Sequence, residues 1–154
     1  LYDSAEDAQI GIVVTAARYR GKWVLCRHRG RETYECPGGH REAGETVLQA
    51  AGRELWEETG AQDFDLTPVC LYSVCRDGMT TYGMLYAADI RTLGPLPPME
   101  IESIELFDRL PDKERWTYPE IQPLLVREAA GMEARRGRSA EGTENVSENR
   151  APER

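Results

Sequence analysis

Two apolar runs within the first 28 residues have the character of strands, and a polar, glycine-rich segment follows them. Residues 9–19 (QIGIVVTAARY) are β-branched and mostly apolar, which predicts a buried strand. A turn at Arg20-Gly21 follows, and residues 22–28 (KWVLCRH) predict a second strand. Residues 29–45 are rich in glycine and charge around Pro37-Gly38-Gly39, and we expect them to form a loop.

The next segment has the signals of a helix with defined ends. Thr46 and Gln49 have the spacing of a capping box, in which both side chains accept hydrogen bonds from free backbone amides. Gly60 is suited to end the helix, because glycine readily adopts the left-handed conformation found there. Apolar residues recur at spacings of three and four, and we expect them to form the buried stripe: Leu48, Ala51 and Leu55.

The second half of the chain predicts three further strands. Residues 66–76 and 80–90 are strand-like, and Asp77-Gly78 between them is a strong hairpin signal. Residues 93–98 (LGPLPP) must form a loop, because proline removes backbone donors and fixes φ. Residues 101–107 alternate like another strand, which completes the strands expected of one sheet.

A final helix and a polar tail are expected to end the chain. Residues 117–120 (TYPE) have the pattern of a second capping box, with a kink at Pro123. One helix face would then carry Ile121, Leu124 and Leu125. Residues 131–154 contain no aromatic residue and few large apolar ones, so they cannot offset the entropy of ordering. We expect one domain over residues 1–130 and a flexible polar tail over residues 131–154.

Net charge narrows the classes of partner. The 154 residues carry a formal charge of −8 at pH 7. This balance disfavours nucleic-acid polymers and anionic membranes, because binding to either needs clustered Lys and Arg. No apolar run approaches the roughly 20 residues of a membrane span. A small anionic substrate remains compatible with the charge if a metal ion reverses its sign locally.

The cysteines favour a reducing compartment. The four of them show no C-x-x-C pair of the zinc or redox type: Cys26, Cys36, Cys70 and Cys75. Three lie in strand-like surroundings, where a free cysteine packs as a small hydrophobic residue. Residues 1–7 show neither the basic nor the apolar region of a signal peptide. We therefore expect a cytoplasmic protein with free thiols, with disulfides or zinc binding as the less favoured alternative.

Acidic residues on the predicted 46–60 helix carry the clearest chemical signal. Three carboxylates lie within one arc of roughly 100°: Glu54, Glu57 and Glu58. A solvated acidic face would explain these three alone, with Arg53 offsetting part of their charge. It does not explain the exposed carbonyls expected around Pro37-Gly38-Gly39 or the further carboxylate of Glu45. Together these oxygens form the donor set that Mg²⁺ or Mn²⁺ prefers.

These residues resemble the Nudix box. From Gly39 to Ala61 the chain matches G-x5-E-x7-R-E-U-x-E-E-x-G-U, where U is aliphatic, although Ala61 is small for the last position. The resemblance covers the box and, more loosely, the strand order over residues 8–130. It implies an α/β (α+β) Nudix fold, with a mixed sheet sandwiched between helices. It also implies metal-dependent hydrolysis of a nucleoside diphosphate linked to another moiety.

The resemblance further implies a role for each matching residue. The expected metal ligands are the carboxylates and one backbone carbonyl: Glu54, Glu57, Glu58 and Gly38. Arg53 would orient a glutamate, and Glu45 would support the junction of loop and helix. Family members often add an acid from a later loop, for which Glu100 is our first candidate and Glu102 the second. Both could equally be surface charges, and the general base stays open among Glu54, Glu57, Glu100 and Glu102.

Residues outside the box bear on the substrate. The marks of NADH, ADP-ribose and dinucleoside polyphosphate hydrolases are missing, whereas residues 34–39 (YECPGG) look like the W-E-F-P-G-G of MutT-like nucleotide-sanitising enzymes. We expect a nucleoside triphosphate pyrophosphohydrolase of the 8-oxo-dGTP diphosphatase type. The alternatives are a pyrophosphatase for ADP-ribose or dinucleoside polyphosphates, and a Nudix module that binds a nucleotide without cleaving it.

Several side chains are candidates to contact that small nucleotide. Four aromatic rings could stack on its base: Tyr34, Tyr82, Trp116 and Tyr118. Three arginines could contact its phosphates: Arg27, Arg29 and Arg31. Packing is the favoured explanation for each ring taken alone, and the three alternating arginines are also compatible with a solvated strand end. His28 and His40 show no partner pattern, so the sequence assigns them no role. It leaves open the base, the leaving group, the number of metal ions and the choice between monomer and homodimer.

Overall fold

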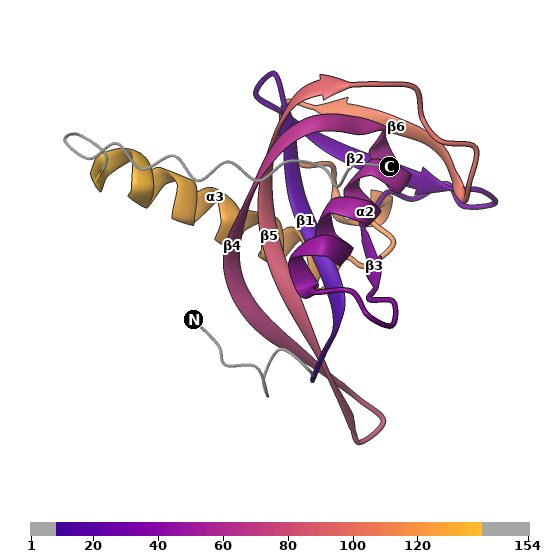
Figure 1. Cartoon of the computed structure of the whole chain (residues 1–154), viewed down its shortest axis with the longest axis vertical. Coiled ribbons are helices and arrows are strands. Elements are labelled where there is room, and N and C mark those ends of the chain that lie inside the picture. The colour runs from indigo at the N-terminus through magenta and orange to yellow at the C-terminus, as the bar shows by residue number, and fades with distance from the viewer. Residues whose placement is uncertain (1–8, 140–154) are drawn as a thin grey trace.

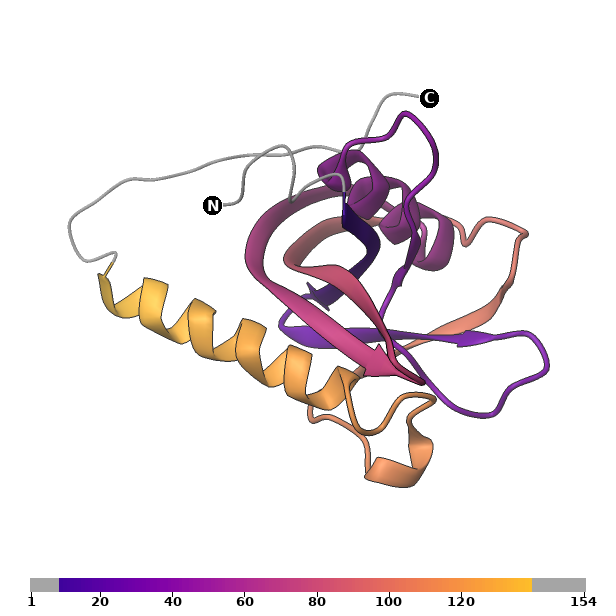
Figure 2. The same ribbon diagram turned by 90° about the horizontal axis from the view of Figure 1, so that it is seen from below.

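One mixed β-sheet lies between two helices (Figures 1 and 2). The computed structural model describes residues 9–139. Its strands are β1 (Ile10–Tyr19), β2 (Lys22–His28), β3 (Gly38–His40), β4 (Ala61–Arg76), β5 (Met79–Leu93) and β6 (Ile101–Phe107). Its helices are α2 (Val47–Thr59) and α3 (Gln122–Ser139), with a short 3-10 turn, η1, at Lys113–Arg115. The fold class expected from the sequence is confirmed.

The sheet runs in the order β4-β5-β1-β2-β6, and β3 pairs with β1 beside this path. Strands β1 and β5 are parallel, and the other pairs are antiparallel. Two tight turns close the hairpins, and both of their central residues have positive φ, at Arg20-Gly21 and at Asp77-Gly78. The two turns therefore lie at the residues that the sequence predicts.

Alternation along the strands divides the core into two layers. On β1, Val13 and Ala17 belong to the cluster that contains the buried residues of α2, whereas Val14 and Ala16 belong to the cluster that contains those of α3. On β2, Val24 lies in the α2 cluster. Because side chains of a strand alternate between faces, one apolar strand can supply both layers. The two helices therefore cover opposite faces of the same sheet (Figure 2).

Helix α2 has the predicted ends but a different buried face. Thr46 Oγ1 accepts a hydrogen bond from the Gln49 amide at 3.1 Å, and Gln49 Oε1 accepts one from the Thr46 amide at 2.9 Å. Gly60 ends the helix with φ of 80°. Leu48 is 37% exposed, so its place in the buried stripe is wrong. The apolar residues that are buried are Val47, Ala50, Ala51 and Leu55, a face that begins one residue earlier.

Long-range pairing extends the strands beyond their apolar segments. The predicted loop of residues 29–45 contains β3, which lies against β1. Strand β4 begins at Ala61 instead of residue 66, because its first residues pair with the end of β5. Asp63 and Asp65 on this extension form ion pairs with Arg91 of β5. Charged residues lower local strand propensity, but here they pair across the two strands.

Helix α3 begins later than the sequence predicts. The Thr117 hydroxyl lies 2.7 Å from the Thr33 hydroxyl, and the helix starts at Gln122, so the expected capping box at Thr117 is wrong. Pro123 lies in the first turn, where its missing N–H has no helical acceptor to lose, so the expected kink has no cause. Leu124 is 59% exposed, and the buried face carries Leu125, Val126 and Ala129.

The same helix continues into the expected polar tail. Residues 131–139 are helical, and the remainder of that tail, residues 140–154, lies outside the described residues. Met132 packs on the α3 layer of the core. Glu133 Oε2 lies 3.3 Å from Arg18 Nη2, and the Arg18 guanidinium lies 3.9 Å from the centre of the Trp23 ring. A helix already fixed by buried residues extends easily through the good helix formers of residues 132–136 (MEARR), which composition alone does not reveal.

Replacing Met132 by Ala tests whether this helical extension supports the fold. Met132 is partly buried, so the substitution should lower the free energy of unfolding by about 1 kcal/mol. For a chain of this size, the melting temperature should fall by roughly 2–4 °C in a thermal melt. Leu124→Ala on the exposed face of α3 is the matched control and should change it little. Equal melting temperatures for the two variants would mean that Met132 does not contribute to the core.

All four cysteines are free, as the sequence predicts, and no disulfide constrains the fold. Cys26 and Cys36 are buried, Cys70 is partly exposed and Cys75 is exposed. Over residues 9–139, neither helix combines the length and the hydropathy that a membrane span requires.

Candidate metal and nucleotide site

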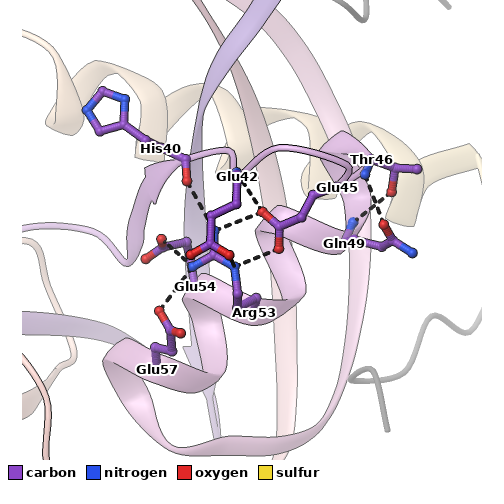
Figure 3. A network of polar contacts seen from close by, with 8 residues as sticks. All are labelled: His40, Glu42, Glu45, Thr46, Gln49, Arg53, Glu54 and Glu57. Carbon is purple, nitrogen blue, oxygen red and sulfur yellow. Dashed lines mark hydrogen bonds and ion pairs between the residues drawn. The ribbon is translucent and has the colours of Figure 1, made fainter. Parts of the chain in front are cut away.

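Arg53 of α2 bonds three carboxylates of the acidic box, the box motif from Gly39 to Ala61: Glu45, Glu54 and Glu57 (Figure 3). Its Nε and Nη2 donate to the two oxygens of Glu45, at 2.6 and 2.9 Å. Its Nη1 donates to Glu54 Oε1 at 2.8 Å and to Glu57 Oε2 at 3.1 Å. Its Nη2 also donates to the carbonyl of His40 in β3. The guanidinium thus holds β3, the following loop and two helix carboxylates in one arrangement.

Electrostatics within this network differ from one carboxylate to the next. Hydrogen bonds from Arg53 lower the pKa of Glu45, which therefore remains ionised as a structural anchor. Burial raises the pKa of Glu54, and its hydrogen bond from Arg53 opposes that rise. Glu54 is thus held partly out of water with incomplete compensation of its charge.

Glu58 is the most buried carboxylate of the box. Only 7% of its side chain is exposed, and its Oε1 accepts a hydrogen bond from the Gly38 amide at 2.8 Å. Burial raises the pKa of Glu58 to about 8, and the nearby charges of Glu54, Glu35 and Glu100 act in the same direction. A buried carboxylate surrounded by others of like charge is the environment in which a divalent cation gains most.

Two glycines let the backbone of β3 lie against these carboxylates. A Cβ on Gly39 would come within 2.6 Å of Glu54 Oε1, and a Cβ on Gly38 would overlap the Val13 carbonyl. Only glycine therefore allows β3 to pair with β1 while Glu54 occupies its present position. Both glycines of the motif are required for this close approach of β3 to β1 and to Glu54. The Gly38 amide also donates a hydrogen bond to Glu58.

A cleft of about 450 Å³ opens beside the box, a volume typical of small-molecule sites. Its acidic wall carries Glu54, Glu58 and Glu100. Its other walls carry apolar and aromatic side chains from β1, β4, β5, α3 and the residue before α3: Ile12, Val14, Tyr72, Tyr82, Leu125 and Ile121. Tyr118 and Gln122 also line it. The cleft thus combines an anionic end with a hydrophobic end, which suits a nucleotide whose phosphates are accompanied by metal.

Most of the site residues expected from the sequence border this cleft. Lining residues include five of them besides Glu58: Gly38, Glu54, Glu100, Tyr82 and Tyr118. Glu57 is not among the lining residues, and its Oε2 accepts a hydrogen bond from Arg53. Glu100 is better placed than Glu102, because the Glu102 carboxylate is 43% exposed and bonds Arg29 at 2.6 Å.

Three expected substrate contacts are not supported by their positions. The Tyr34 ring packs edge-on against Phe107, with ring centres 5.3 Å apart, and Tyr34 does not line the cleft. Arg27 is the neighbour of His28 on β2, so its side chain points away from the cleft that His28 lines. Its Nη1 donates to the Arg31 carbonyl. Trp116 is 3% exposed in the core, where its indole N–H donates to the Pro111 carbonyl. Their aromatic or basic character serves packing and local hydrogen bonding.

Three polar residues of the cleft were not predicted from the sequence: His28, Glu35 and Gln122. His28 Nε2 lies 2.9 Å from Glu35 Oε1 and 3.4 Å from Glu58 Oε2. Gln122 is 7% exposed, and its Oε1 accepts a hydrogen bond from the Cys36 amide at 2.7 Å. The sequence does place Cys26 and His28 two residues apart on one strand, which predicts that their side chains share a face. No local pattern marks Gln122, because α3 reaches the cleft only through tertiary packing.

Comparison with known proteins gives this site a family. The NUDIX domain family matches residues 6–120. The chain belongs to the Nudix hydrolase family. This confirms the family expected from the box between Gly39 and Ala61, and members of this family generally require divalent metal ions. The matched residues include the whole box from Gly39 to Ala61.

Individual relatives of this Nudix chain carry names of nucleotide-cleaving enzymes. It is 38% identical over 96 residues to Bacillus subtilis YtkD, which is provisionally named an 8-oxo-dGTP diphosphatase. That alignment spans 62% of this chain and 60% of YtkD, which is less than two thirds of the relative's length. The crystal structure of the Bacillus subtilis pyrophosphohydrolase BsRppH is 27% identical, with a TM-score of 0.69, covering 93% of this chain and 90% of that one.

A more distant Nudix structure shares the fold alone. The Nudix domain of NrtR from Shewanella oneidensis, solved with ADP ribose, is 14% identical with a TM-score of 0.61. The similarity covers 86% of this chain and 94% of that one. Small-molecule nucleotides are thus ligands of proteins with this fold.

Proposed function

We propose that this chain is a divalent-metal-dependent pyrophosphohydrolase that cleaves nucleoside triphosphates to the monophosphate and pyrophosphate. The observation that carries the proposal is the convergence of the Glu54 and Glu58 carboxylates on the Gly38-Gly39 edge of a nucleotide-sized cleft. The named relatives YtkD and BsRppH support the reaction class. An acidic protein can accept such a substrate because metal offsets the charge of the phosphates.

The proposed metal ligands are the box carboxylates and the Gly38 carbonyl, with Glu100 as a further candidate. All of these donors are oxygens, which fits Mg²⁺ or Mn²⁺ and agrees with the buried, like-charged environment of Glu58. When bound, the metal would neutralise phosphate charge and lower the pKa of a water molecule. Arg53 would keep Glu54 and Glu57 in position, and Glu54, Glu57 or Glu100 would take the proton from the attacking water.

The proposed substrate is a purine nucleotide of the sanitising type, such as 8-oxo-dGTP. Tyr82 and Tyr118 are each 38% exposed and border the cleft, so either ring could stack on a base. The buried Gln122 amide directs its oxygen to the Cys36 N–H, which leaves its NH₂ group as a donor toward the cleft. The 38% identity to YtkD supports the same substrate class.

A substrate panel separates this proposal from its alternatives. With Mg²⁺, kcat/KM should be highest for purine nucleoside triphosphates and at least about tenfold lower for ADP-ribose and diadenosine polyphosphates. Such a ratio corresponds to about 1.4 kcal/mol of transition-state discrimination, within the range that a few pocket contacts supply. A preference for ADP-ribose would contradict the substrate class and leave the reaction class intact. Binding without cleavage of every compound would indicate a non-catalytic module.

Gly39→Ala tests whether β3 positions the Glu54 carboxylate. The added Cβ meets the flexible end of that side chain, so the fold should tolerate it while the carboxylate shifts. A misplacement of about 1 Å can lower turnover roughly 100-fold, and we expect a loss of this size in kcat with little change in melting temperature. Gly11→Ala in β1 is the matched control, because its Cβ would meet no atom of residues 9–139 within 4 Å. Wild-type kcat in Gly39→Ala would contradict the placement of Glu54.

A further inference from the structure

A second group of potential metal-binding side chains lies next to the acidic box. Cys26 and His28 are two residues apart on β2 and therefore point to the same side of the strand. One potential ligand atom from each of Cys26, His28 and Glu58 lies within 4.8 Å of the other two. Cys26 and Glu58 are buried, and His28 lines the cleft. The group therefore joins one sulfur, one nitrogen and one carboxylate at the inner end of the cleft.

Glu35 supplies a fourth donor to the same place. Its Oε2 is taken by Arg31 at 3.1 Å, whereas its Oε1 faces His28 Nε2 at 2.9 Å. The Glu35 side chain is 10% exposed, and an isolated bridge between Cys26 and Glu35 fixes their two backbones side by side. The Cys26 thiol itself reaches the Glu35 carbonyl at 3.3 Å. The Glu35 carboxylate thus lies beside the group of Cys26, His28 and Glu58, in contact with the imidazole of His28.

His28 Nε2 is a polar atom that the protein itself leaves unsatisfied. Within residues 9–139 it is buried from solvent and makes no hydrogen bond of acceptable geometry, although it lies at ion-pair distance from Glu35 and Glu58. Buried polar atoms are normally hydrogen-bonded, so an orphaned ring nitrogen among a thiol and two carboxylates calls for an explanation. A metal ion bound by its lone pair would satisfy it.

We propose that Cys26, His28, Glu58 and Glu35 form a binding site for Zn²⁺ or a similar borderline-soft divalent ion. Zn²⁺ prefers four ligands drawn from thiolate sulfur, imidazole nitrogen and carboxylate oxygen, which is this donor set. Mg²⁺ takes oxygen ligands in octahedral geometry, so sulfur and nitrogen donors disfavour it. The site is therefore chemically distinct from the all-oxygen box, although the two share Glu58.

The shared carboxylate has a functional consequence that rests on the proposed hydrolase activity. Glu58 Oε1 accepts the Gly38 N–H, so Oε2, which lies 3.4 Å from His28 Nε2, is the oxygen for which a zinc ion beside His28 and a metal ion held by Glu54 would compete. Zn²⁺ should therefore inhibit turnover supported by Mg²⁺, and additional Mg²⁺ should relieve the inhibition only by competing for Glu58. Zinc would act on this protein as an inhibitor from within the cleft.

Cobalt substitution tests the site without relying on activity. Co²⁺ added to the metal-free, reduced protein should give the near-ultraviolet sulfur-to-cobalt charge-transfer band of a thiolate ligand, saturating at one ion per chain, and Zn²⁺ should displace it. Cys26→Ser and His28→Gln should each remove the band or weaken Co²⁺ binding more than the roughly 10- to 100-fold that loss of an outer-shell partner costs. Cys36→Ser and Cys75→Ser, one buried and one exposed, should retain the band.

Each outcome of the titration decides between the site and its alternatives. No charge-transfer band in the wild type, or a band that survives in Cys26→Ser, would overturn the proposal. A band lost only in Cys75→Ser would show binding to an exposed thiol instead. If the band follows Cys26 and His28 but Zn²⁺ does not inhibit turnover, the zinc site stands and its coupling to the hydrolase reaction is wrong.

Discussion

Glu58→Gln should lower kcat about 100- to 1,000-fold and leave the fold intact. The substitution removes a negative charge from the most buried carboxylate of the box while keeping an oxygen that can accept the Gly38 N–H. Metal supplies several kcal/mol of transition-state stabilisation, and each 1.4 kcal/mol corresponds to a factor of ten in rate. Glu57→Gln should lower kcat in the same way. Single-turnover rates at saturating Mg²⁺, with circular dichroism of each variant, provide the measurement.

The matched control for these variants is Glu102→Gln. Glu102 lies outside the cleft, is 43% exposed and pairs with Arg29, so its replacement should change kcat less than about twofold. A wild-type rate in Glu58→Gln or Glu57→Gln at saturating Mg²⁺ would contradict the metal assignment. A large loss in Glu102→Gln would move the later-loop acid from Glu100 to Glu102.

Mg²⁺ or Mn²⁺ should raise the melting temperature of the wild-type protein by about 5–10 °C at a hundredfold excess over Kd. An ion that binds only the folded state adds about 2.7 kcal/mol at that concentration, and each kcal/mol shifts melting by roughly 2–4 °C in a chain of this size. The double variant Glu54→Gln/Glu58→Gln should lose most of this response. Thermal melts with and without metal, at constant ionic strength, measure both effects.

The same double variant, without metal, should melt no lower than the wild type. Burial disfavours the charged forms of both carboxylates, which is why their pKa values are raised in the fold. Glutamine removes that penalty, while Glu45 continues to hold Arg53 with two hydrogen bonds. If Mg²⁺ or Mn²⁺ raised the melting temperature of the wild type no more than NaCl does at the same ionic strength, a preformed metal site would be contradicted. Metal would then have to arrive with the substrate phosphates.

Local spacing predicts the acidic side of the site well. The box fixes the positions of Arg53, Glu54 and Glu58 on one helix, and its capping residues define where that helix begins. These relations involve residues within one or two helical turns, so periodicity is sufficient to place them. Gly39 is also part of the motif, although the reason for it, the contact with Glu54, requires the folded structure.

The opposite side of the cleft depends on contacts that no local pattern contains. Gln122 meets Cys36 across 86 residues of sequence, and His28 meets Glu58 across 30. Tyr34 has the composition of a base-stacking residue, but its tertiary neighbour is Phe107. Residue type alone cannot distinguish these outcomes, because stacking on a base and packing in a core require the same rings.

The extent of α3 was underestimated for a related reason. Composition assigns residues 131–139 to a solvated tail, since they contain one large apolar residue. Their helix is an extension of a buried one, so nucleation is already provided and each further residue needs only to propagate it. The packing of Met132 and the ion pair of Glu133 with Arg18 then add tertiary contacts.

The central claim, metal-dependent pyrophosphohydrolysis in this cleft, is tested most directly by identifying products with ³¹P nuclear magnetic resonance. Wild-type protein, Mg²⁺ and a purine nucleoside triphosphate should yield the nucleoside monophosphate and pyrophosphate in equal amounts. EDTA should stop the reaction, and Glu58→Gln should slow it about 100- to 1,000-fold. No cleavage of any triphosphate, or cleavage that persists unchanged in EDTA and in Glu58→Gln, would contradict the account.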